Sequence, residues 1–116
     1  MGRVTFERDS DLEVPTDPKH PKGAVLRSDR MELTEVRFNA GAGADTHAHP
    51  EEQTFLVIQG HLRVWLGDGP PYDVTAGECS HHPSNVPHRV LAVEDTVALS
   101  FKDIVDPTYA ATGDLG

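Results

Sequence analysis

Short runs in which apolar and polar residues alternate, separated by turns rich in glycine and proline, make up most of the chain after residue 23. In the segment 61–66 (HLRVWL), three aliphatic residues alternate with histidine, arginine and tryptophan, which is the period of a half-buried strand. The segment 53–58 (QTFLVI) is apolar on both faces, so we expect it to be covered on both sides. Apart from a possible turn in residues 106–116, no helical period of useful length is present. The pattern therefore predicts an all-β fold.

The chain has 116 residues, which suits a single domain with one core. Closely spaced prolines exclude regular structure toward the end of residues 1–23, which we expect to form an N-terminal arm. Residues 24–105 carry the strand pattern and form the predicted domain. Glycines and small residues in 106–116 predict a C-terminal tail.

Charge and composition exclude several classes of function. The net charge is −9, and no cluster of lysine and arginine is available to neutralise phosphates, so we expect no nucleic-acid partner. The longest apolar runs are a few residues, so we expect neither a signal peptide nor contact with a membrane. The single cysteine, Cys79, excludes an internal disulfide and is typical of a cytoplasmic protein.

The stretch with the most chemical content reads THAHPEEQ and contains His47, His49 and Gln53. Residues i and i+2 of a strand point to the same face, so an extended segment 44–49 would project both imidazoles side by side. Pro50 would end that strand, and a turn could then bring Gln53 back toward the imidazoles. Two ring nitrogens and an amide oxygen that converge on one point suit a divalent metal ion.

A fourth candidate ligand, His88, opens another strand-like segment after a proline-rich turn. The residues by themselves leave two interpretations open. They could form a metal site, or they could be ordinary histidines in a chain that contains seven.

The wider context of the first histidine pair resembles the first sequence motif of the cupin superfamily. Gly41, His47, His49 and Gly60 occupy motif positions, and Gln53 stands where the family usually has glutamate. The spacing of all five residues agrees with that motif.

The second cupin motif is matched by Gly77, Pro83 and His88. Asn85 takes the place of a glycine in that motif, and Ala92 takes the place of an asparagine. Two motifs in register favour the metal site over the ordinary-histidine interpretation.

The resemblance implies a double-stranded antiparallel β-barrel of the jelly-roll (cupin) type, and it implies a homodimer. It further implies one mononuclear divalent metal ion held by His47, His49, Gln53 and His88. Mn, Fe, Ni, Co, Cu and Zn are all compatible with histidine and glutamine ligands. Glu52 is the alternative to Gln53, although it would point to the opposite face if the strand begins at Gln53.

Three imidazoles and a carboxamide carry no charge, so the ion would keep its full positive charge and favour an anionic oxygen ligand. We therefore expect a small-molecule substrate and Lewis-acid chemistry of the isomerase, lyase or cyclase type. The run from His47 to Gln53 looks like that of small bacterial cupins of the pectin-degradation and polyketide-cyclase types. An Fe(II)-dependent dioxygenase is the alternative, since neutral histidine sites in this superfamily also support oxygen chemistry. A non-catalytic module that binds a metal or a metabolite is a further alternative.

Gln53 cannot accept a proton, so a catalytic base would have to come from elsewhere. Alternation in the segment 96–103 places Val97, Leu99 and Phe101 on one face, and the same stripe ends at Asp103. If this stripe faces the barrel interior, Asp103 would lie at the barrel mouth and could act as the base. A solvated aspartate at the end of a strand is the alternative.

Two adjacent histidines, His81 and His82, precede the second motif's proline. Only one of them can face inward in an extended strand, and that one could be a proton shuttle, a substrate contact or a core histidine. Glu51 and Glu52 are interpreted as solvated charges.

Overall fold

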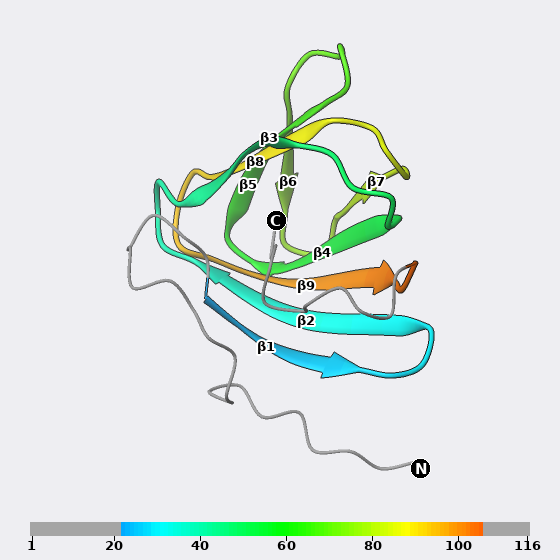
Figure 1. The fold of residues 1–116 in the computed structure, drawn as a ribbon. Coiled ribbons are helices and arrows are strands. Elements are labelled where there is room, and N and C mark those ends of the chain that lie inside the picture. The colour runs from blue at the N-terminus through cyan, green and yellow to red at the C-terminus, as the bar shows by residue number, and fades with distance from the viewer. Residues whose placement is uncertain (1–21, 106–116) are drawn as a thin grey trace.

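The computed structural model describes residues 22–105, and these residues form nine β-strands and no helix (Figure 1). The strands are β1 (Lys22–Arg27), β2 (Met31–Phe38), β3 (Gly43–His47), β4 (Gln53–Gln59), β5 (His61–Leu66), β6 (Tyr72–Thr75), β7 (Cys79–His82), β8 (His88–Ala92) and β9 (Thr96–Asp103). No segment within this range could therefore cross a membrane as a helix. The expected C-terminal tail and most of the expected N-terminal arm lie outside the described residues.

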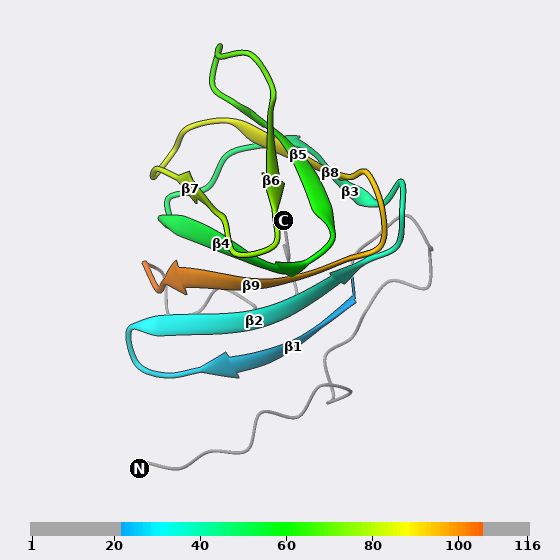
Figure 2. The same cartoon turned by 180° about the vertical axis from the view of Figure 1, so that it is seen from behind.

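Two antiparallel sheets face each other and enclose the interior of the barrel. One sheet has the order β1-β2-β9-β4-β7 and the other has the order β3-β8-β5-β6. Figures 1 and 2 are views from opposite sides, and both show the first sheet as a curved layer beneath the second. Neighbours such as β3 and β8 are distant in sequence, so the topology brings the two histidine segments together. The predicted all-β antiparallel jelly-roll barrel is confirmed.

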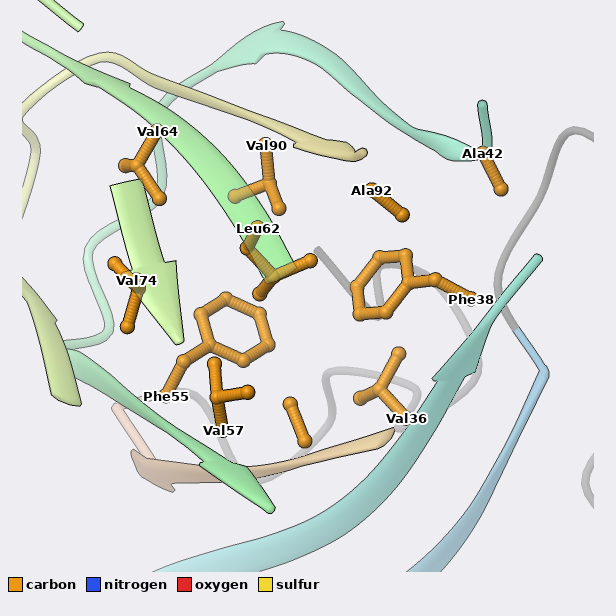
Figure 3. Close-up of a cluster of buried hydrophobic side chains, with 11 residues drawn as sticks. Val36, Phe38, Ala42, Phe55, Val57, Leu62, Val64, Val74, Val90 and Ala92 are labelled. Carbon is orange, nitrogen blue, oxygen red and sulfur yellow. The ribbon is translucent and has the colours of Figure 1, made fainter. Parts of the chain in front are cut away.

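Alternation along the strands determines which side chains fill the barrel. In β5, Leu62 and Val64 are buried, as the alternation predicts. In β4, Phe55 and Val57 are buried on the same face as Gln53, whereas the opposite face is less covered in the single chain, with Ile58 48% exposed. Figure 3 shows these side chains converging from opposite sheets, with the rings of Phe38 and Phe55 close together. The two ring centroids are 6.4 Å apart in an edge-to-face arrangement. The apolar core is made of Val36, Phe38, Ala42, Phe55, Val57, Leu62, Val64, Val74, Val90, Ala92 and Ala98.

The prediction for β9 is wrong about which face lies inside. The buried residues are Ala98 at its centre and the polar side chains Thr96, Ser100 and Lys102, whereas Phe101 is 38% exposed. The stripe that ends at Asp103 therefore faces away from the barrel interior. Pairing with β2 explains this, because Ser100 and Lys102 lie opposite inward-facing residues of that strand. Hydrophobicity alone misassigned the face, because this end of the barrel is polar inside.

Two turns require backbone conformations that most side chains disfavour. Gly60 connects β4 to β5 with φ of +103°, and a Cβ there would collide with Thr96 and the Asp95 carbonyl. Asn85, between β7 and β8, has φ of +61°, a left-handed conformation that asparagine tolerates better than most residues. That tolerance explains why asparagine can stand where the second motif has a glycine.

Candidate metal centre

Three histidines meet inside the barrel where β3 lies beside β8. His47 ends β3 and pairs directly with His88, the first residue of β8, while His49 follows two residues later in the chain. Their ring centroids are 4.3 to 5.5 Å apart, and one ring nitrogen from each lies within 4.8 Å of the others. His49 and His88 are buried and His47 is half-buried. The strand ends at His47 rather than at residue 49, but the expected convergence of these histidines is observed.

Each of these histidines has its Nδ1 within hydrogen-bonding distance of a backbone carbonyl two residues away. The distances are 2.7 Å from His47 to Asp45, 2.9 Å from His49 to Glu51, and 3.1 Å from His88 to Val86. A carbonyl oxygen can only accept a hydrogen bond, so Nδ1 must carry the proton in all three rings. In the neutral form of each ring, Nε2 is then the unprotonated nitrogen, and this is the form that coordinates a metal ion.

Gln53 lies fully buried on the same interior surface. Its Nε2 donates to Ser100 Oγ at 2.8 Å, while its Oε1 has no hydrogen-bond partner among residues 22–105. Within the same range, the buried Nε2 of His49 also has no partner. Unsatisfied buried acceptors are costly, and a cation would satisfy both. The residues present therefore fit a metal ion, with Gln53 Oε1 available beside the histidine trio of His47, His49 and His88.

Glu52, the alternative ligand, faces away from this centre. It is exposed, and its carboxylate lies 2.7 Å from His81 Nε2 on the outer face of the first sheet. Glu52 immediately precedes Gln53, the first residue of β4, and consecutive side chains of an extended chain point in opposite directions. The geometry thus leaves Gln53, and not Glu52, on the side of the histidine trio.

Asp103 also lies outside the barrel. Its side chain is exposed, and its Oδ1 accepts a hydrogen bond of 2.7 Å from the backbone nitrogen of Glu52. The expectation that Asp103 projects inward at the barrel mouth is wrong, because β9 presents its odd-numbered side chains to the outer face. In this position Asp103 fixes the turn that precedes β4, and its proposed role as a base gains no support from the geometry.

His82 is the member of the adjacent histidine pair that faces inward. It is fully buried, and its ring centroid lies 4.4 Å from that of His88. The pKa of His82 is lowered to about 3, first because burial penalises the charged ring and then because His88 and His49 are close. The ring is therefore neutral at physiological pH. His81, in contrast, is exposed.

A polar row that the sequence analysis did not find crosses the first sheet at the level of Gln53. Backbone pairing aligns one residue from each of its five strands: Arg27, Glu32, Lys102, Gln53 and His82. Burial raises the pKa of the Glu32 carboxyl, and this effect is partly offset by the nearby charges of Lys102 and Arg27. The signal was present in β2, where glutamate and threonine share the face of the apolar core residues that follow.

Glu51 is a further polar residue of this region whose burial the sequence did not predict. It was interpreted as a solvated charge but is only 4% exposed, and it lines a small pocket together with Glu32 and Lys102. Its position in a turn gave no periodic signal from which burial could be predicted.

Solved structures of similar shape agree with this architecture. An RmlC-like cupin from Shewanella frigidimarina has a TM-score of 0.75 and 20% identity, covering 93% of this chain and 97% of that one. KdgF from a Halomonas species has a TM-score of 0.74 and 22% identity, covering 86% and 94%. A variant of Bacillus subtilis oxalate decarboxylase has a TM-score of 0.72 and 24% identity, covering 95% of this chain but 32% of that one. At these identities the likeness concerns the fold alone.

A sequence comparison supplies the family. No curated protein matches the chain at a significant level. The sequence model of the cupin domain, however, matches residues 34–105, which is more than half of the chain and includes every residue of the candidate centre. Together with the barrel and its inward histidines, this match shows that the protein belongs to the cupin family.

Proposed function

We propose that the protein is a mononuclear metal-dependent enzyme that acts on a small, anionic, oxygenated metabolite. The observation that carries this proposal is the tautomer of the histidine trio, in which every Nδ1 is held by a backbone carbonyl. A divalent ion bound there would supply Lewis-acid polarisation of a substrate oxygen. His47, His49 and His88 would hold that ion through Nε2, and Gln53 would contribute Oε1.

The charge of this ligand set favours an anionic substrate. Within residues 22–105, the only cluster of candidate metal-binding His, Cys, Asp or Glu side chains is the neutral histidine trio. Ser100 orients the Gln53 amide by accepting its N–H, so the oxygen and not the nitrogen remains available. A carboxylate or enolate oxygen would therefore meet a centre whose positive charge no protein ligand reduces. Isomerase, lyase or cyclase chemistry needs only such polarisation.

The first experiment measures metal content. Protein purified without added metal should contain about one divalent ion per chain by elemental analysis. His47→Ala should lose most of it, because a ligand is removed from a largely buried centre. His81→Ala is the matched control, since this exposed histidine lies on the outer face of the first sheet, away from the histidine trio. Equal metal content in wild type and His47→Ala would contradict the proposed centre.

The second experiment separates the classes of function. Small hydroxy- and keto-carboxylates are incubated with the Zn²⁺-loaded protein, with and without oxygen, and products are followed by NMR. Product formation without oxygen supports Lewis-acid chemistry. A strict need for Fe(II), with one oxygen consumed per substrate, would instead identify a dioxygenase. Saturable binding without a product under either condition would identify a binding module.

A further inference from the structure

A chain of three hydrogen-bonding side chains runs from the surface to the buried ring of His82. Tyr72 is 37% exposed, and its hydroxyl oxygen lies 2.7 Å from Ser80 Oγ. Ser80 is buried, and its Oγ lies 2.8 Å from His82 Nε2. Ser80 thus connects a phenol on one side to an imidazole on the other.

The chemistry of the groups gives this chain a direction. A phenol is a stronger acid than an alkyl hydroxyl, so Tyr72 is the better donor and Ser80 accepts from it. Ser80 then has its single proton left to donate to His82 Nε2. A neutral imidazole that accepts at Nε2 carries its own proton at Nδ1. His82 is therefore the same Nδ1–H tautomer as the three proposed ligand histidines, but its nitrogens are engaged the other way round. Its Nε2 accepts from Ser80 and its Nδ1–H has no partner among the described residues, so the ring is suited to donating a hydrogen bond inside the barrel rather than to binding a metal.

The surroundings of His82 supply a reason for such a donor. Backbone pairing places His82 opposite Gln53 on the inner face of the sheet, and its ring lies against that of His88. In the part of the chain that the structure describes, neither His82 Nδ1 nor Gln53 Oε1 has a hydrogen-bond partner, although both are buried. One atom is a donor and the other an acceptor. A cation that carries an anionic oxygen ligand would satisfy both atoms. The cation would bind Gln53 Oε1, and the ligand oxygen would accept a hydrogen bond from His82 Nδ1.

We propose that His82 donates its Nδ1–H to an oxygen of the anionic substrate, and that Ser80 and Tyr72 are positioning residues that fix this tautomer. This inference rests on the proposed function and narrows it, because the substrate must offer an acceptor oxygen beside its metal-bound oxygen. Carboxylates and α-hydroxy acids have this arrangement. No proton is transferred in this role, since His82 acts as a fixed donor to developing negative charge.

The tautomer can be measured directly by NMR of ¹⁵N-histidine-labelled protein, both metal-free and loaded with Zn²⁺. Long-range correlations should show the His82 proton on Nδ1 in wild type. Ser80→Ala should move that proton wholly or partly to Nε2, whereas Ser80→Thr should retain it because the hydroxyl remains. His81→Asn supplies the assignment control. A wild-type ring protonated at Nε2 would overturn the proposal.

Anion affinity provides the second readout, with acetate as the probe and the visible spectrum of bound Co²⁺ as the signal. His82→Phe, which keeps an aromatic ring beside Phe55, should bind Co²⁺ normally and acetate about tenfold more weakly. Ser80→Ala should show a smaller loss that Ser80→Thr restores, and His81→Asn should show none. Unchanged acetate affinity in His82→Phe with normal Co²⁺ content would overturn the assignment of His82 alone. Failure of wild type to bind Co²⁺ would overturn the metal centre as well.

Discussion

At the scale of single residues, the centre consists of side chains whose hydrogen bonds each leave one defined atom for a ligand. Backbone carbonyls hold the Nδ1–H of the histidine trio, and Ser100 holds the amide nitrogen of Gln53. These partners determine ring tautomers and amide orientation before any ligand binds. The centre is therefore pre-organised by neutral groups, and its net charge depends on a neutral side chain at position 53.

Gln53→Glu tests that dependence. The variant should retain the metal, since a carboxylate is also a ligand, but it adds a negative charge beside the anion site. Two unit charges about 4 Å apart interact by about 4 kcal/mol at an effective dielectric constant of 20, so acetate affinity should fall at least tenfold. Gln59→Glu is the matched control, because it makes the same change at an exposed position of the same strand. Equal losses in both variants would contradict the argument.

At the scale of elements, alternation predicted most strands but not every inward face. In β5 and β8 the apolar face is the buried face, so a period of two was sufficient. In β4 both faces are largely apolar, so alternation showed which side chains share a face but not which face is buried. In β9 the more apolar face is outside, because the interior near the histidine trio is lined by polar side chains. The histidine trio and Gln53 were predictable from motif spacing. Glu51 and the tautomer of His82 depend on tertiary contacts that no local pattern encodes.

The orientation of β9 can be checked with two cysteine variants in a Cys79→Ser background, which removes the exposed native thiol. Phe101→Cys should react rapidly with a maleimide in folded protein diluted below the micromolar range, where the expected dimer is dissociated, since position 101 is on the outer face. Ala98→Cys should react only after unfolding, since Ala98 is fully buried. The reverse order of reactivity would contradict this orientation and would support the sequence-based prediction that Phe101 faces the barrel interior.

At the scale of the whole molecule, the outer face of the first sheet exposes apolar side chains. Met31 is 60% exposed, Ile58 48% and Phe101 38%. A second copy of the chain would cover such a surface, and we expect a homodimer at micromolar concentrations. Light scattering coupled to size exclusion would measure the mass, and Phe101→Glu should shift it toward the monomer. A wild-type monomer would contradict this expectation.

The stability of the metal-free barrel should depend on pH through His82. Its pKa is about 3 in the folded protein against an ordinary value of 6.5, so the unfolded chain takes up a proton that the folded barrel resists. The stabilisation is complete above pH 6.5 and is lost as the pH falls toward 3. Urea unfolding with a chelator present should show this group's contribution falling by up to about 1.4 kcal/mol per pH unit. His82→Phe should have a flatter profile, and an identical slope would count against the buried neutral ring.

The most direct test of the metal centre is the anomalous diffraction signal of crystals grown from metal-loaded protein. The account predicts one strong peak inside the barrel, about 2.0 to 2.3 Å from Nε2 of His47, His49 and His88 and from Oε1 of Gln53. Coordination through Nδ1, a peak at Glu52 or the absence of a peak among the three histidines would contradict it.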